Sequence, residues 1–262
     1  MNLAEELSTV ALRAASAAAV ELMARFGGPV AGVTSKTSRT DLVSDADRAA
    51  ERAVLEVLTA ERPGDSVLAE EGGGADTGSA VSWIVDPLDG TTNYLWGIPQ
   101  WSVSIAAVDE RGTVVGIVLD PCRGEVFRAV RGEGAWRNDQ RLVLGPAAEL
   151  GEALVGTGFN YRAEERARQA PIVADLLPDV RDIRRFGSAA LDLAWVAAAR
   201  LDVYFERGVE VWDWTAGALL VVEAGGVVTP LPPTAERPPG IIAGPRPLVE
   251  ALRHRIEPVP RA

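Results

Sequence analysis

Apolar residues recur at helical spacing through the first part of the chain. Small apolar residues fill one face of the stretch 3–26, which predicts a long amphipathic helix that ends at Gly27-Gly28-Pro29. Ser44, followed three residues later by Asp47, starts a second predicted helix that runs to about Ala60. In this pattern Asp47 already has a structural explanation, because an acidic residue at that place completes a helix cap.

Short apolar runs follow the two helices and predict strands. The runs 66–69 and 82–85 each end at a carboxylate, Glu70 and Asp86. If these two strands lie side by side, their ends bring the two carboxylates together. Three more strands are predicted, and the four-residue turns between them are typical of an antiparallel meander: 101–108, 113–120 and 125–130.

After Gly145-Pro146 the pattern changes to an alternation of strands and helices. Strands are predicted at 153–157, 180–184, 201–206 and near 240–243, and helices at 163–177, 188–199, 213–224 and 246–256. The proline-rich stretch 230–239 is predicted to be a surface loop. We expect a single domain over 1–262, with an N-terminal α+β half at about 1–145 and a C-terminal α/β half at about 146–262. The expected fold is an αβαβα sandwich of helix layers and mixed, largely antiparallel sheets.

The overall charge excludes several classes of partner. The 262 residues carry 26 Lys and Arg against 37 Asp and Glu, a net charge of −11, and form no basic stripe. Nucleic acid and anionic membranes are therefore not expected as partners. The acidic N-terminus does not resemble a signal peptide, and no uncharged apolar run reaches the ~18 residues of a membrane span. A cytoplasmic protein is expected.

The chain has a single cysteine, Cys122, and a single histidine, His254. This composition excludes a disulfide framework, a Cys/His zinc site and a Cys–His catalytic pair. Cys122 falls in a predicted turn, and His254 is expected on the surface of the last helix. With many carboxylates and no spare imidazole, the chain is limited to a hard metal site of oxygen ligands, which suits Mg²⁺, Mn²⁺ or Ca²⁺.

The stretch Ser82–Tyr94 combines a strand, a turn and a helix start. Asp86 and Asp89 lie three residues apart across a tight turn, so their carboxylates can converge on one point. Two such close carboxylates repel each other unless a cation lies between them or one takes a proton. Gly90 permits a sharp turn, and Thr91 opens a short helix whose first N–H groups favour an anion. Ordinary turn chemistry is the alternative interpretation of this stretch.

Asp213 lies at the start of a helix that is apolar nearly all round. It stands between Trp212 and Trp214, and the residues after it predict burial on every face of the helix. A carboxylate there complements the helix dipole, which is a purely structural explanation. A buried charge also needs a partner, and a metal ion is a good candidate.

Four blocks of sequence, taken in order, resemble the inositol monophosphatase family of Mg²⁺-dependent, lithium-sensitive phosphatases. The blocks are Lys36–Asp47, Ala69-Glu70-Glu71, Asp86–Asn93, and Trp212-Asp213 with the following Ala216-Gly217 and Glu223–Gly226. The resemblance spans roughly residues 1–260, and the third block is the most specific of the four. An EF-hand calcium site is disfavoured, because Asp86–Gly90 lacks the alternate-residue ligand spacing of such a loop.

The resemblance implies a set of site residues. One Mg²⁺ is bound by Glu70, Asp86 and the Leu88 carbonyl, and a second by Asp86, Asp89 and Asp213. A third, weaker ion uses Glu70 through water near the Lys36 loop, and Mn²⁺ is a possible substitute. The implied catalytic residues are Glu70, Thr91 and Asp47. The implied substrate-binding residues are Asp89, Gly90, Thr91, Ser188, Ala189, Glu206 and Asp213, with Gly187 beside them.

The resemblance further implies hydrolysis of a small phosphorylated polyol by an activated water, without a covalent enzyme intermediate, in a homodimer. Inositol 1-phosphate is the favoured substrate, because Thr92-Asn93-Tyr94 and Glu206 match the version of the motif in the inositol phosphatases. Histidinol phosphate and fructose 1,6-bisphosphate are the alternatives on the same scaffold. Arg207 is a candidate for recognising a second anion. A non-catalytic binding protein is the competing class, and the presence of every acidic ligand disfavours it.

Overall fold

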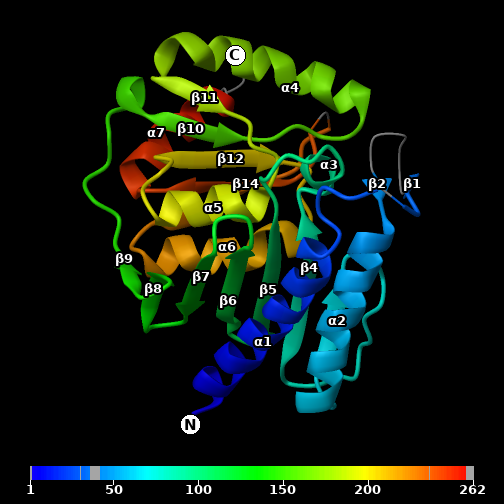
Figure 1. Ribbon diagram of the computed structural model, residues 1–262. Helices are drawn as coiled ribbons and strands as arrows, with labels where there is room; N and C mark the ends of the chain where they lie inside the picture. The colour runs from blue at the N-terminus through cyan, green and yellow to red at the C-terminus, as the bar shows by residue number, and fades with distance from the viewer. Residues whose placement is uncertain (1, 30, 36–41, 236, 258–262) are drawn as a thin grey trace.

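The computed structural model describes residues 2–29, 31–35, 42–235 and 237–257. Helix pairs and sheets alternate in layers: α1 and α2, a seven-stranded sheet, α5 and α6, a five-stranded sheet, then α4 and α7 (Figure 1). The predicted αβαβα sandwich is confirmed. Three hydrophobic clusters fill the spaces between successive layers.

The first layer is built from helices with alanine-rich inner faces. α1 (Leu3–Met23) and α2 (Asp45–Glu61) contact each other and cover one face of the seven-stranded sheet. Buried alanines let the helices approach closely. Ser44 caps α2 as predicted, and the Ser44 N–H donates in turn to the Asp47 carboxylate. A two-stranded sheet of β1 (Thr34–Ser35) and β2 (Leu42–Val43) precedes α2.

The seven-stranded sheet has the order β3-β4-β5-β6-β7-β8-β9. Only β3 and β4 pair in parallel, and every other neighbouring pair is antiparallel, so the predicted meander is confirmed. Two short strands, β8 and β9, extend it beyond the prediction. The strand bounds are β3 (Ser66–Ala69), β4 (Ser82–Asp89), β5 (Ser102–Asp109), β6 (Gly112–Asp120), β7 (Glu125–Val130), β8 (Gly134–Arg137) and β9 (Gln140–Leu142).

The five-stranded sheet has the order β11-β10-β12-β14-β13. Its strands are β10 (Leu154–Thr157), β11 (Asp182–Arg184), β12 (Val203–Arg207), β13 (Val227–Leu231) and β14 (Gly240–Gly244). The prediction of a loop from residue 230 is wrong at its start, because Pro230 belongs to β13. β13 is an edge strand, and an edge tolerates a proline that has no N–H to donate.

Helices cover both faces of this second sheet. α5 (Ala189–Ala197) and α6 (Val211–Glu223) lie between the two sheets, and the short α3 (Thr91–Leu95) follows β4. α4 (Ala163–Leu176) and α7 (Arg246–Ile256) lie on the outer face, with single 3-10 turns at Leu150–Glu152 and Leu177–Asp179. His254 is exposed on α7, and Cys122 lies in the turn between β6 and β7, both as predicted.

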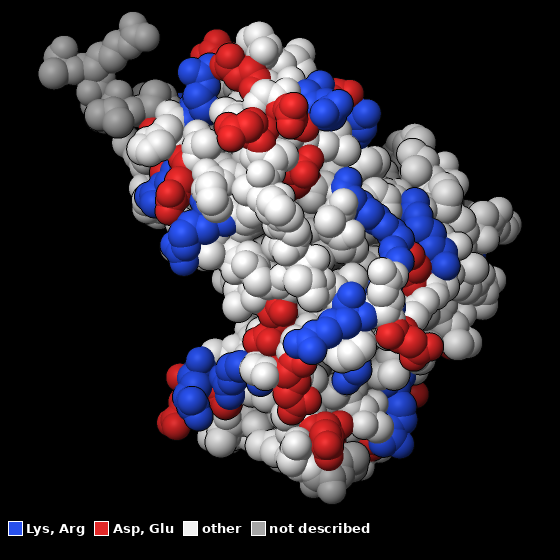
Figure 2. All heavy atoms as spheres, turned by 90° about the vertical axis from the view of Figure 1, so that its left-hand side faces the viewer, with Lys and Arg blue, Asp and Glu red and all other residues white. Residues whose placement is uncertain are grey.

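The surface carries charges of both signs side by side. On the face shown in Figure 2, acidic and basic side chains of the described residues are interspersed, and neither sign forms a continuous stripe. That face therefore lacks the basic track typical of nucleic-acid binding. Among the described helices, none combines the length and the apolar character needed to cross a bilayer.

Candidate active site

A β-bulge turns Asp86 and Asp89 towards the same side of β4. Asp86 pairs with Ser104 and Asp89 pairs with Ser102, so three steps along β4 oppose two steps along β5. In a regular strand, residues three apart point to opposite faces; the extra residue restores them to one face. The Asp86 carboxylate accepts the Leu88 N–H at 2.9 Å, which fixes the bulge.

The neighbouring strand and α6 add two more carboxylates. β3 pairs in parallel with β4, and the Glu70 N–H donates to the Val85 carbonyl, so Glu70 stands beside Asp86 where the sequence predicted it. Asp213 lies in the first turn of α6, where its carboxylate accepts the Glu210 N–H at 2.7 Å. Four carboxylates, from the residue after β3, from β4 and from α6, thus line one cavity.

The ionised forms of these four carboxylates are unfavourable when no cation is bound. Burial, together with the charges of Glu70, Asp89 and Asp213, raises the pKa of Asp86 well above its usual range. Burial also raises the pKa of Asp213, helped by the charges of Asp89 and Glu70. For Asp89, burial raises the pKa to about 7 against opposing hydrogen bonds from Ser188 and Ala190. The site gathers more negative charge than its own cationic neighbours offset.

Asp89 is held by two donors from the start of α5. The Ser188 hydroxyl donates to Asp89 Oδ2 at 2.6 Å, and the Ala190 N–H donates to the same oxygen at 2.7 Å. The Ser188 side chain is therefore directed at Asp89 and is not among the residues lining the cavity. Gly187 and Ala189, on either side of it, do line the cavity.

Thr91 and Asp47 form a buried pair beside the carboxylates. The Thr91 hydroxyl lies 3.1 Å from Asp47 Oδ1 and 3.1 Å from the Leu88 carbonyl. Asp47 is fully buried, and its other oxygen accepts both the N–H and the hydroxyl of Ser44. Asp47 therefore completes the cap of α2, as predicted, and also accepts a hydrogen bond from the Thr91 hydroxyl.

The cavity has a volume of about 600 Å³ and opens between the two sheets. Glu206 lines its far side from β12, where the Tyr204 hydroxyl donates to its Oε2 at 2.6 Å. Burial raises the pKa of Glu206. Gly158 leaves room for Glu206, since a Cβ at that position would lie 1.9 Å from Glu206 Oε2.

The structure places the site residues predicted from the sequence around this cavity, apart from the Lys36 loop, which lies outside the described residues. Those on the wall are Glu70, Asp86, Leu88, Asp89, Gly90, Thr91, Ala189, Glu206 and Asp213. Asp47 and Ser188 stand behind it and bond to Thr91 and Asp89. Wall residues that sequence reasoning missed include Tyr161, Arg162, Arg185 and Trp212. Arg185 and Trp212 adjoin motif residues, which is a signal that the sequence offered.

Arg207 does not face the cavity as an anion binder. Its guanidinium is buried and donates to the carbonyls of Pro232 and Pro238 and to the Glu257 carboxylate. The interpretation of Arg207 as a recogniser of a second anion is therefore wrong for this structure. The residue holds the segment after β13 and the end of α7 together.

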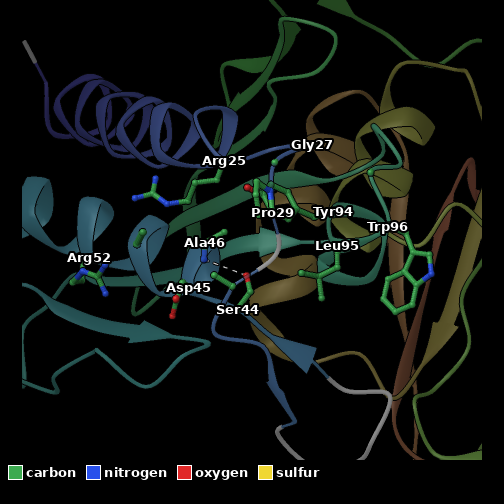
Figure 3. A pocket seen from close by; sticks show the side chains of 14 residues that line it. Arg25, Gly27, Pro29, Ser44, Asp45, Ala46, Arg52, Tyr94, Leu95 and Trp96 are labelled. Carbon is green, nitrogen blue, oxygen red and sulfur yellow. Dashed lines mark hydrogen bonds between the residues drawn. The ribbon is translucent and has the colours of Figure 1, made fainter.

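A separate cavity of about 610 Å³ lies where the end of α1, the start of α2 and the end of α3 meet (Figure 3). Its polar groups are largely bonded within the protein. Ser44 Oγ accepts the Ala46 N–H, the Tyr94 hydroxyl donates to the Leu22 carbonyl, and Arg25 pairs with Glu21. Volume therefore does not distinguish the two cavities, and the reactive site is identified by the converging carboxylates.

The donor set suits a hard divalent cation, because every candidate ligand is a carboxylate or carbonyl oxygen. Among the described residues, with the side chains in their present positions, no group of three or more Asp, Glu, His or Cys residues is arranged to hold a metal ion. A cation would offset the burial and the mutual repulsion that together raise the pKa values of Asp86, Asp89 and Asp213. The residues present fit a metal, and binding it requires the carboxylates to draw closer.

The chain is similar to known proteins over nearly its whole length. The model of the inositol monophosphatase family matches residues 3–257. Inositol-1-monophosphatase SuhB of Mycobacterium tuberculosis is 46% identical over 215 residues, which cover 79% of this chain and 74% of that protein. Nus factor SuhB of Pasteurella multocida is 45% identical over 197 residues, 74% of each chain. The extragenic suppressor protein suhB of Bartonella henselae has a crystal structure that superposes with a TM-score of 0.87 at 35% identity, covering 96% of this chain and 98% of that one.

Proposed function

The chain belongs to the inositol monophosphatase family, and from that premise we propose that it hydrolyses a small phosphate monoester with Mg²⁺, most readily an inositol monophosphate. One observation carries the proposal: Glu70, Asp86, Asp89 and Asp213 converge at one cavity beside the Thr91–Asp47 pair. An acidic cavity repels a phosphate ester unless cations reverse the local field. The same carboxylates supply the ligands for those cations.

We propose two metal positions, with the ligand sets that the family resemblance implies. We assign Glu70, Asp86 and the Leu88 carbonyl to one Mg²⁺, and Asp86, Asp89 and Asp213 to another, with Mn²⁺ as a substitute. A third, weaker ion would use Glu70. When bound, the metal supplies positive charge that lowers the pKa of a bound water and stabilises charge on the ester oxygens. The hydrogen bonds from Ser188 and Ala190 hold Asp89 in place for this role.

Thr91 and Asp47 orient the attacking water. Asp47, as the charged acceptor, draws the single Thr91 hydroxyl proton more strongly than the Leu88 carbonyl does. A lone pair of the Thr91 hydroxyl then accepts a hydrogen bond from the water. Glu70, which lines the same cavity, is the proposed base. We assign the N–H groups of Gly90 and Thr91, at the start of α3, to binding the phosphate.

The far side of the cavity suits the hydroxyl groups of a polyol. The Glu206 carboxylate, already fixed by Tyr204, has acceptor capacity left for a substrate hydroxyl. The backbone of Gly187–Ala189 lies beside it. Ser188 lies behind the wall and acts through the hydrogen bond that its hydroxyl donates to Asp89.

A panel of phosphate esters tests the substrate assignment. Turnover of D-myo-inositol 1-phosphate, L-histidinol phosphate and fructose 1,6-bisphosphate is compared at one Mg²⁺ concentration. The proposal expects the highest kcat/KM for the inositol ester and a drop in the Glu206→Gln variant that is larger for this ester than for the others. Faster turnover of histidinol phosphate would transfer the assignment to that ester.

The similarity to a Nus factor SuhB favours a second candidate function, in which the chain acts as a Nus factor. Complementation of a bacterial strain lacking its Nus factor SuhB, by the wild type and by Asp89→Asn, separates the two candidates. Rescue by both proteins would assign a role that does not need hydrolysis. Failure of both would leave the phosphatase as the only candidate.

The family also suggests a homodimer in solution. Light scattering coupled to size-exclusion chromatography gives the mass directly. A mass near twice 27.7 kDa supports the dimer, and a mass near 27.7 kDa contradicts it.

A further inference from the structure

The Asn93 side chain links two parts of the chain that lie far apart in the sequence. It is buried, with 7% of its surface exposed. Its Nδ2 donates to the Gln100 carbonyl at 2.7 Å and to the Phe186 carbonyl at 2.7 Å. A side-chain amide has two N–H donors, and both are used here. Asn93 thus joins the segment after α3 to the segment that leads into α5.

The backbones at this junction are in close contact. Gly90 has φ +97°, and a Cβ on it would lie 3.0 Å from the Gln100 carbonyl oxygen and 3.2 Å from that of Gly187. Gly187 has φ +88°, and a Cβ there would lie 3.1 Å from Asn93 Nδ2. Both positions require glycine. The Asn93 amide therefore lies between two backbone segments that are packed too closely to move relative to each other.

The segment that Asn93 fixes at Phe186 supplies the donors to Asp89. Two residues after Phe186, the Ser188 hydroxyl reaches Asp89 Oδ2, and the Ala190 N–H reaches the same oxygen. The Phe186 ring also meets the Trp195 ring edge-on, with centroids 4.9 Å apart. The path from Asn93 to Asp89 thus runs through one carbonyl, two residues of backbone and one hydroxyl.

We propose that Asn93 is a positioning residue that orients Asp89 for metal binding by holding the Phe186–Ala190 segment in register with the β4 bulge. The inference rests on the proposed function, since it assigns Asp89 to a metal. Asn93 itself does not contact the substrate. Outer partners of metal ligands typically contribute about 10- to 100-fold in metal affinity, and an indirect one is expected near the lower end.

Calorimetric titration of the protein with Mn²⁺ alone tests the assignment. Asn93→Ala is expected to weaken Mn²⁺ binding about tenfold. Ser188→Ala is expected to do the same, because it removes one donor to Asp89 directly. In the double variant the two effects should combine to less than their product, since both act through one carboxylate. Mn²⁺ affinity measures the ligand set without reference to turnover.

Tyr94→Phe is the matched control. Tyr94 is the next residue of the same short helix, is buried, and loses one hydrogen bond that leads away from the site, to the Leu22 carbonyl. It should lower the melting temperature while leaving Mn²⁺ affinity within twofold of wild type. Equal weakening by Tyr94→Phe and Asn93→Ala would reduce Asn93 to a general structural role and overturn the inference.

Two further outcomes separate this inference from the proposed function. Wild-type Mn²⁺ affinity in a folded Asn93→Ala protein overturns the positioning role and leaves the phosphatase proposal intact. If Asn93→Ala does not fold, Asn93→Ser, which keeps one donor, is judged by the same criterion. Absence of Mn²⁺ binding by the wild type itself would overturn both proposals.

Discussion

Replacing Asp89 by asparagine should stabilise the metal-free protein while abolishing its activity. Asp89 is nearly buried, at 9% exposure, and its pKa is raised to about 7 by burial, with further contributions from the charges of Glu206 and Glu70. Asparagine keeps the shape and one oxygen to accept the bonds from Ser188 and Ala190. It removes the charge that the site tolerates poorly without a cation.

The size of this gain in the free energy of unfolding follows from the difference between the ordinary and the folded-state pKa of Asp89. The ordinary value is 3.8 and the folded value is about 7, and each pKa unit is worth about 1.4 kcal/mol. The upper bound is therefore about 4 kcal/mol at pH 8. Because the folded state binds the proton more tightly, the wild type loses stability as the pH rises from about 4 to about 7. Asp89→Asn does not share this loss.

Thermal unfolding in EDTA at pH 5 and pH 8 measures the effect. Asp89→Asn should melt higher than the wild type at pH 8, by up to about 10 °C, with a smaller difference at pH 5. Excess Mg²⁺ should reduce or reverse the order, since it stabilises the wild type by about 2.7 kcal/mol at 100 times Kd. A variant that is no more stable than the wild type at pH 8 in EDTA would refute the electrostatic reasoning.

Asp109→Asn is the control, because the pKa of Asp109 is shifted in the opposite direction to that of Asp89. Asp109 pairs with Arg131 at 2.7 Å, and the hydrogen bond from that guanidinium lowers the pKa of Asp109 to about 2. Its stabilising contribution is present above pH 4 and fades as the pH falls towards 2. Asp109→Asn should therefore not raise the melting temperature at pH 8.

Two further substitutions test the remaining assignments. Arg207→Met should lower the free energy of unfolding by about 3 kcal/mol, because it removes three hydrogen bonds, to the carbonyls of Pro232 and Pro238 and to Glu257, which among the described residues keeps only Arg253 as a partner. KM should stay unchanged; a raised KM, measured by phosphate release, would restore Arg207 as an anion binder. Gly90→Ala should cost about 1–2 kcal/mol for its left-handed backbone alone, and more through the 3.0 Å contact with the Gln100 carbonyl oxygen. The free energy of unfolding, measured by chemical denaturation, and kcat should both fall, and normal values of each would contradict the close backbone contacts described at Gly90.

Local patterns in the sequence were enough to predict most of the acidic site. Strand ends at Glu70 and Asp86, and a charge at the start of the apolar α6, each indicated a carboxylate that needs a partner. The convergence of Asp86 and Asp89 was predicted from a tight turn. The structure achieves it with a β-bulge, which depends on the pairing register with β5 and is not visible in one strand alone.

Contacts between distant segments could not be predicted in the same way. Ser188 lies 99 residues from Asp89 and Asn93 lies 93 residues from Phe186, so no local pattern links either pair. Arg207 was misassigned because a charged residue near a site suggests binding, whereas its acceptors come from segments 25 to 50 residues away. Pro230 was placed in a loop because proline disfavours interior strands, and only the strand order shows that β13 is at an edge.

The most direct test of the central claim is phosphate release from D-myo-inositol 1-phosphate, with Mg²⁺ titrated from zero and EDTA as the control. The account predicts no release in EDTA and a saturable rise with Mg²⁺. It also predicts that Asp89→Asn stays inactive across the titration. Release that does not depend on a divalent metal, or no release from any ester of the panel at any Mg²⁺ concentration, would contradict it.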